Sequence, residues 1–317
     1  MKKNVITLMG MAALVPLFAL SLAACASQGS SVAGQTSAGL PVPDQASVLR
    51  AAVRNQADWS LPLDPYKLSD PHLNTYAEHL AAQPCLAEHG LVLNVPWQDP
   101  GESLSATMNG TGQRLFTPQI ARKWGYHSAQ MDSVSRTLWD RYLRSYRDLD
   151  RNEDFNMKFS NCIEGVRADN PLPDMDDQTF VFGLSMQARD DATQAPPVLE
   201  AAARWSQCMV TSGASDVPAS PEQMPTLKMA EKFGLGADPA KSSSDVVISE
   251  EEIDLATLQA DCENTSGYRS ALYTAQWDLE QQKLTNDAER LHGIGTDVAR
   301  YHDGVEALID ELAPPAP

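Results

Sequence analysis

Basic residues are scarce in this chain of 317 residues, which has 24 Lys and Arg against 42 Asp and Glu. The formal net charge is −18 as a result. A surface of this sign repels the phosphates of nucleic acids and the headgroups of anionic lipids. We therefore predict no nucleic acid partner and no adhesion to a membrane through a basic face.

Sequence motifs for catalysis and metal binding are also lacking. The six histidines have no recognised metal-ligand spacing to one another or to a cysteine, and we expect them at the solvated surface. Residues 183–187 begin like a nucleophile elbow, but Gln187 stands where that turn needs a small residue. Residues 148–154 resemble the start of a calcium loop, but Glu153 replaces its glycine, so we interpret them as a helix boundary with Asn152 as N-cap. The sequence predicts no catalytic residue, no metal and no cofactor.

The N-terminal residues have the pattern of a secretion signal, with two lysines followed by an almost wholly apolar run over residues 5–24. The run ends in Leu22-Ala23-Ala24-Cys25, which resembles the lipobox of bacterial lipoproteins. This resemblance implies cleavage before Cys25, a lipid on Cys25 and attachment to the extracytoplasmic face of the cell membrane. A transmembrane anchor is the less favoured alternative, because Pro16 interrupts the run.

Four segments follow from composition and turn signals. Residues 1–24 are the signal peptide, and residues 25–43, rich in Ser, Gly and Ala, form a flexible tether of roughly 25 Å. The rest of the chain is long enough for one large domain or two modest ones. We expect two helical modules, at 44–177 and 178–317.

Besides Cys25 there are four cysteines, and an even number in an oxidising compartment predicts two disulfides. Spacing alone allows three pairings. An apparent internal repeat chooses among them, because Cys85 and Cys208 each precede a glycine by five residues, then an Ala-x-Lys-aromatic-Gly segment, then a second cysteine. If each copy closes on itself, Cys85 pairs with Cys162 and Cys208 with Cys262. The alternative is coincidence, since the intervening lengths differ.

Most of the chain has apolar residues at helical spacing, and strand-like alternation is scarce. We therefore predict an all-α fold stapled by disulfides, with Val246 to Ile248 as the one candidate strand. Pro84 is expected to break or kink its helix. The predicted apolar helix faces are Leu73, Tyr76, Ala77 and Leu80; Met131, Val134, Leu138 and Tyr142; Phe155, Phe159, Cys162, Ile163 and Val166; and Val198, Ala201, Ala202, Trp205, Cys208 and Met209.

From Leu284 onward the apolar spacing becomes sevenfold, which is the pattern of a coiled-coil seam. One interpretation is self-association through this helix. Gly293, Gly295 and Gly304 disfavour it, because each costs a free-standing helix about 1 kcal/mol relative to Ala. We expect instead a long C-terminal helix covered by its own chain, and a monomer. The seam residues are Leu291, Ile294, Val298, Tyr301, Val305 and Leu308.

In its Trp205-x-x-Cys208-Met209 element and tethered helical body the chain is similar to uncharacterised cysteine-paired lipoproteins of high-GC Gram-positive bacteria, a similarity that implies no activity. We predict a lipid-anchored envelope protein with a non-catalytic binding or structural role toward a protein or cell-wall partner. The alternative is an envelope hydrolase, because 42 acidic residues leave many carboxylate pairs that a helical fold can bring together. A solute receptor is disfavoured, since it requires alternating strands and helices.

Overall fold

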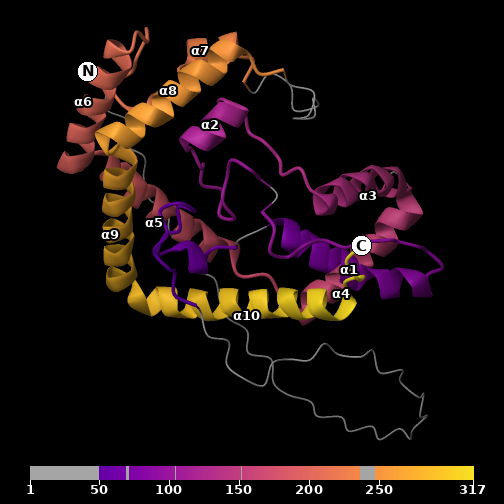
Figure 1. The fold of residues 1–317 in the computed structure, drawn as a ribbon. Coiled ribbons are helices and arrows are strands. Elements are labelled where there is room, and N and C mark those ends of the chain that lie inside the picture. The colour runs from indigo at the N-terminus through magenta and orange to yellow at the C-terminus, as the bar shows by residue number, and fades with distance from the viewer. Residues whose placement is uncertain (1–49, 69–70, 104, 151, 236–246) are drawn as a thin grey trace, which may run out of the picture. The chain divides into compact units, whose positions relative to one another are not determined.

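The computed structural model describes residues 50–317 except 69–70, 104, 151 and 236–246. The predicted signal peptide, the tether and Cys25 lie outside the described residues. In the described part the elements, labelled in Figure 1, are the 3-10 helices η1 (Asp64–Tyr66) and η2 (Pro221–Gln223) and the α-helices α1 (Pro71–Glu88), α2 (Pro118–Trp124), α3 (Val134–Asp150), α4 (Glu153–Asp169), α5 (Met175–Thr193), α6 (Pro196–Thr211), α7 (Leu227–Lys232), α8 (Glu250–Ser266), α9 (Tyr268–Asn286) and α10 (Ala288–Leu312).

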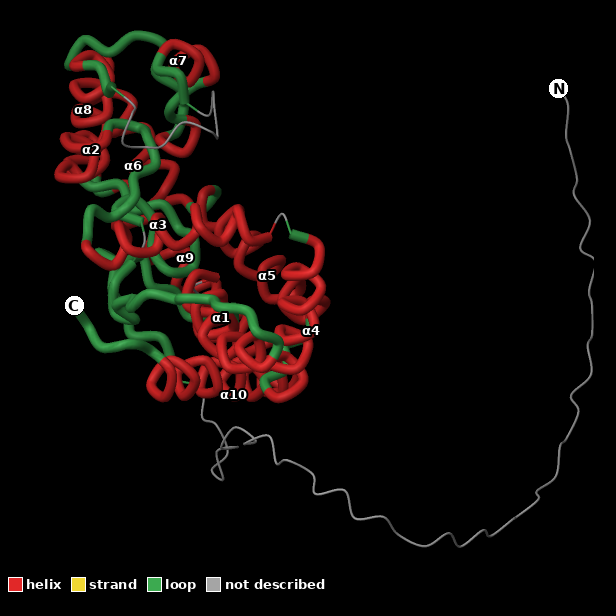
Figure 2. The backbone as a smooth tube through the Cα atoms, turned by 90° about the vertical axis from the view of Figure 1, so that its right-hand side faces the viewer, coloured by secondary structure: helices red, strands yellow, loops and turns green. Residues whose placement is uncertain are grey.

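The all-α prediction is confirmed for these residues, which contain helices and loops but no strand (Figure 2). Extended pairing is limited to three isolated antiparallel bridges, one of which joins Asn55 to Ser60. Val247 and Ile248 lie in no strand, and Val246 lies outside the described residues. The candidate strand was therefore wrong at the two positions that can be judged.

The helices from residue 50 onward belong to one compact unit, which spans 40–317. α2, α6, α7 and α8 gather at one end of it, while α1, α4 and α10 gather at the other (Figures 1 and 2). α9 packs on α5 and α6, and it meets α10 at a sharp bend (Figure 1). Each end has its own buried apolar cluster, so the core is divided rather than continuous.

Both predicted disulfides are present. The Cys85–Cys162 bond joins α1 to α4 at a sequence separation of 77, and the Cys208–Cys262 bond joins α6 to α8 at a sequence separation of 54. The pairing inferred from the apparent repeat is therefore confirmed.

The two cysteine-bracketed segments also share an order of elements. In each, a cysteine-bearing helix ends near a glycine with positive φ, a short helix follows and stops at another such glycine, and a helix with the second cysteine lies farther along the chain. The glycines are Gly90 and Gly125 in the first segment and Gly213 and Gly234 in the second. In the first segment α3 also stands between the short helix and the second cysteine helix, and among the described residues of the second segment no helix holds that place.

Most predicted helix faces are buried, but α3 differs. Met131 and Val134 are exposed, and the buried face of α3 carries Ser135, Trp139 and Tyr142. The prediction for this face was therefore wrong at Met131 and Val134 and correct at Tyr142, because it ranked side chains by hydropathy and missed that Trp139 shares the buried face.

Pro84 does not end its helix, since α1 continues to Glu88. The residues just after it are held by tertiary contacts, with Cys85 bonded to Cys162 and Leu86 fully buried. These contacts offset the backbone hydrogen bond that proline removes. At the start of α4 the prediction was correct, because the side chain of Asn152 caps the helix by accepting a hydrogen bond from the Phe155 amide at 3.1 Å.

The seam of the C-terminal helix is covered by its own chain, as predicted. All six seam residues are buried, and α10 packs against α1, α9 and η1. Leu284 belongs to α9, however, because the helix breaks at Asp287 before α10 begins. The sevenfold row therefore spans two helices, and the predicted single terminal helix is shorter than expected. The monomeric state stays a prediction.

Candidate functional site

A hollow of about 430 Å³ lies between the end of α6, α7 and α8, and we call it the α7–α8 hollow. Its apolar lining consists of Ala214, Met229, Phe233, Leu255 and Leu258. These side chains are buried or half-buried. The volume of the hollow falls in the range of ligand pockets, and a hollow lined by apolar side chains is the usual character of a binding site.

Local sequence signals hold the two helices that form this hollow. Thr226 caps α7 by accepting a hydrogen bond from the Met229 amide, and Ser249 caps α8 by accepting one from the Glu252 amide. The three acids in the first turn of α8 are favoured there by the helix dipole. α7 is short because Phe233 is followed by Gly234 at a φ of 66°, a conformation that suits glycine.

The rim of the α7–α8 hollow is charged and internally paired. The Lys228 ammonium lies 2.8 Å from a carboxylate oxygen of Asp216, and Lys232 pairs with Glu251. The first pair lowers the pKa of Asp216 and raises that of Lys228 through their hydrogen bond. Histidine and cysteine are missing from the residues that line the hollow. The polar side chains of the lining are those of serines, acids and lysines.

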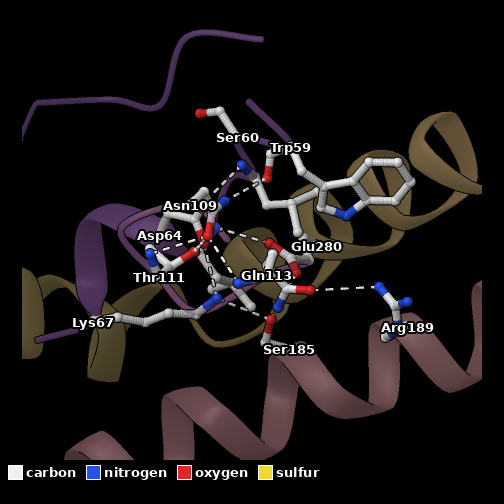
Figure 3. Close-up of polar contacts among 12 residues, drawn as sticks. Trp59, Ser60, Asp64, Lys67, Asn109, Thr111, Gln113, Ser185, Arg189 and Glu280 are labelled. Atoms are coloured by element: carbon white, nitrogen blue, oxygen red, sulfur yellow. Dashed lines mark hydrogen bonds and ion pairs between the residues drawn. The ribbon is translucent and has the colours of Figure 1, made fainter. Parts of the chain in front are cut away.

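A second, more polar hollow of about 390 Å³ is lined by Val53, Asn55, Asp58, Ser60, Asp64, Asn109, Gly110 and Thr111. We call it the polar groove. Asn109 joins its two walls (Figure 3), because its amide nitrogen donates to the carbonyls of Asp58 and Trp59 at 2.9 and 3.3 Å. Its carbonyl oxygen accepts from the amides of Thr111 and Gln113 at 3.1 and 2.8 Å. The Asn109 side chain thus clamps one loop onto the other.

Behind the polar groove, Glu280 of α9 is fully buried. It accepts hydrogen bonds from the Leu63 amide at 3.0 Å and the Ser185 hydroxyl at 2.8 Å (Figure 3). Burial raises the pKa of Glu280, while the charge of Lys67 and these hydrogen bonds act in the opposite direction. Glu280 is enclosed, and it joins the segment around Leu63 to Ser185 of α5. Its role is therefore to hold that segment against α5 and α9.

Two of the residues that line the polar groove are carboxylates, Asp58 and Asp64. A two-acid hydrolase with its active site in this groove would have to use this pair. Both oxygens of Asp64 accept hydrogen bonds, one from the Leu61 amide at 2.7 Å and one from the Lys67 ammonium at 2.8 Å. Each oxygen of Asp64 is thus used by a contact within the chain, so the geometry gives Asp64 a structural role.

The first disulfide has a histidine beside it. Nitrogen of His89 and the sulfurs of Cys85 and Cys162 lie within 4.8 Å of one another. A bonded sulfur is not a thiolate, the form that binds metals, so the imidazole is the one ligand this group offers in its oxidised state. Sequence reasoning missed the contact, although Cys85 and His89 are four residues apart, with Cys85 in the last turn of α1 and His89 directly after it.

His79 corrects the prediction of solvated histidines. It is only 7% exposed and lies among the rings of Trp139, Tyr142, Tyr146 and Phe159. Its Nδ1 is 2.5 Å from the Tyr142 hydroxyl. Burial lowers the pKa of His79 to about 4, so the imidazole is neutral at neutral pH. The error arose because His79 shares the buried face of α1 with Tyr76 and Leu80.

None of the described helices is both long enough and apolar enough to cross a membrane. Comparison of the chain with protein families, curated proteins and solved structures found no match. Any function must therefore be argued from the residues themselves.

Proposed function

We propose that the protein is a lipid-anchored envelope protein that binds a protein partner without catalysing a reaction, and that the α7–α8 hollow is its binding surface. Attachment rests on the lipobox at 22–25 and the lipid expected on Cys25. The binding role rests on the apolar lining of the hollow and its charged rim.

The physical argument concerns apolar surface. Filling the hollow with one apolar side chain of a partner contributes about 1.5 to 3 kcal/mol. An apolar centre inside a polar rim is also the usual arrangement of a protein interface. Leu227, at the start of α7, is 91% exposed and adds apolar surface on the same short helix. A polysaccharide has too few apolar groups to match this lining, so a protein partner is favoured here.

The alternative hydrolase has less support. The buried acids serve internal contacts, since Glu252 accepts from the Tyr126 amide, Glu263 from the Gln259 amide group and Glu280 from the Leu63 amide. Asp64 is likewise committed within the polar groove. If the hydrolase interpretation were right, Asp58→Asn and Asp64→Asn would each abolish an activity while the protein stayed folded.

The lipid anchor has a direct test. Cells that express the full chain are labelled with a fatty acid analogue, and the wild-type protein is expected to carry the label while Cys25→Ser is not. A Cys25→Ser variant that is still labelled contradicts lipidation at this residue.

The binding surface is tested by photo-crosslinking from two matched positions in the anchored protein. A photo-reactive amino acid replaces Lys228 at the rim of the hollow or Arg300 on α10, whose side chains are 81% and 42% exposed. We expect one discrete adduct from position 228 that is missing from position 300 and is lost when Phe233→Asp is added. Equal adducts from both positions, or none from position 228, would overturn the proposal.

A further inference from the structure

We propose that Arg114 and Arg269 form a binding site for an oxyanion, the carboxylate or phosphate group of a small ligand. The site is separate from the α7–α8 hollow and does not depend on the proposed function. It lies where the loop after Asn109, α5, α8, α9 and η2 meet. The charged residues of this cluster are Arg114, Arg189, Arg269, Glu222 and Glu263.

The internal pairing of the cluster leaves two arginines weakly held. Arg189 is fully engaged, since it pairs with Glu222 and also donates to the side-chain carbonyl of Gln113 at 3.4 Å (Figure 3). Arg269 comes no closer than 3.6 Å to its carboxylate, Glu263. That separation is longer than a hydrogen bond.

The side chain of Arg114 has no hydrogen-bond partner among the described residues. Its guanidinium carbon lies over two aromatic rings, 4.4 Å from the ring centre of Phe116 and 5.9 Å from that of Tyr126. The guanidinium carbon of Arg269 lies over the ring of Trp59, 4.7 Å from its centre. A cation–π contact of this kind holds a guanidinium group without using its N–H donors.

Repulsion between the two arginines also favours an anion. Arg114 is an exposed residue; burial lowers the pKa of its guanidinium group, the charges of Glu263 and Tyr126 oppose this shift, and the charge of Arg269 adds to it. Arg269 and Arg114 therefore repel each other, and an oxyanion between them would relieve that repulsion.

Glu263 is a poor counter-ion for both arginines. It is 3% exposed, and burial raises its pKa to about 7, against the opposing charges of Arg269 and Arg114. One of its oxygens is already taken by the Gln259 amide group at 2.7 Å. At neutral pH the carboxyl is therefore protonated in a large share of molecules, which leaves the arginines still less compensated.

A buried donor next to the cluster is unused. Tyr126 is 7% exposed, and its hydroxyl has no hydrogen-bond partner among the described residues. Its ring lies beneath Arg114, and the charges of Arg114 and Glu263 both act on its hydroxyl. An oxyanion between the two arginines supplies an acceptor for this hydroxyl. Carboxylate and phosphate fit best, since their oxygens match the fork of a guanidinium group.

The test titrates the full chain, purified in detergent, with acetate and separately with inorganic phosphate. Ionic strength is held constant with chloride, and binding is followed by calorimetry. Saturable binding of one of them is expected, and which of the two binds more tightly identifies the ligand class. Arg114→Gln should weaken it about tenfold or more, Arg114→Lys should weaken it less, and Arg300→Gln, on α10, should leave it unchanged.

Thermal unfolding of the same variants shows whether each is folded, and the exposed position of Arg114 makes both substitutions there compatible with folding. Two outcomes overturn the site. One is the lack of saturable binding of either anion by the wild type. The other is equal affinity in the wild type and in a folded Arg114→Gln.

Discussion

The two short helices α2 and α7 hold the same place in the two cysteine-bracketed segments, yet they are packed differently. α2 lies directly on α8, and Ala121 at its centre is fully buried. α7 faces α8 across the α7–α8 hollow and carries the exposed Leu227. Among the described residues the chain therefore packs one short helix directly on α8 and leaves a hollow beside the other, and we propose that a partner fills this hollow.

The apolar clusters at the two ends also differ, in composition and in the ionisable group that lies beside each. The one around the Cys85–Cys162 bond is aromatic and encloses His79, whereas the one around the Cys208–Cys262 bond contains Met209, Met224 and Met229 and borders the buried Glu263. Burial lowers the pKa of His79, so this imidazole resists gaining a proton, and burial raises the pKa of Glu263, so this carboxyl resists losing one. The comparison thus predicts opposite responses to pH from the two ends.

The largest expected effect is the loss of a disulfide. The two cysteine pairs are separated by 54 and 77 residues, and closing loops of this length should stabilise the fold by about 4 kcal/mol each. Cys85→Ala with Cys162→Ala, and Cys208→Ala with Cys262→Ala, are compared by denaturant unfolding. A loss below about 1 kcal/mol in either double variant contradicts a stapling role for that bond.

His79 should make the fold weaker in acid. Its pKa is about 4 in the folded chain against an ordinary value of 6.5, so below 6.5 the unfolded chain takes up a proton that the folded chain refuses. The free energy of unfolding should therefore fall by up to about 3 kcal/mol as the pH drops from 6.5 to 4. His79→Gln should remove this slope, and His292→Gln, at an exposed position, should keep it.

Glu263 should act in the opposite direction. Its folded-state pKa is about 7 against an ordinary 4.5, so the folded chain binds a proton that the unfolded chain has released. Its contribution to the free energy of unfolding should fall by up to about 3 kcal/mol as the pH rises from 4.5 to 7. In Glu263→Gln, stability should depend more steeply on pH, because only the His79 effect stays. Glu250→Gln, exposed on the same helix, is the control, and an unchanged slope in Glu263→Gln contradicts the assignment.

A smaller difference separates the glycines that end the two short helices. A side-chain carbon on Gly125 would lie 2.3 Å from a carboxylate oxygen of Glu252. The same oxygen accepts a hydrogen bond from the Tyr126 amide at 2.8 Å. A side-chain carbon on Gly234 would meet nothing within 4 Å. Gly234→Ala should cost about 1 kcal/mol for its positive φ alone, and Gly125→Ala about 1 to 2 kcal/mol more. Equal losses of thermal stability would show that the Glu252 contact contributes little.

Local signals were enough to predict much of this fold. The cysteine pairing followed from a repeated order of residues, and the cap at Asn152 and the buried face of α10 followed from position and spacing. Two of the wrong predictions have another cause, since the burial of His79 and the course of the helix beyond Pro84 depend on neighbours from distant segments.

The candidate sites could not be predicted from the sequence for the same reason. Arg114, Glu263 and Arg269 come from three separate segments, and no spacing in the chain links them. The α7–α8 hollow depends on how far α7 stands from α8, which apolar periodicity does not encode. The lipid anchor, by contrast, is a prediction from sequence alone.

The most direct test of the binding account compares the two short helices in one experiment. Amide hydrogen exchange is measured on the anchored protein in isolated envelope membranes and on the same protein purified in detergent. If a partner occupies the α7–α8 hollow, the amides of α7 should exchange more slowly in the membranes than in detergent, while those of α2 should exchange equally in both. Equal exchange of α7 in the two preparations, or slowing confined to α2, would contradict the account.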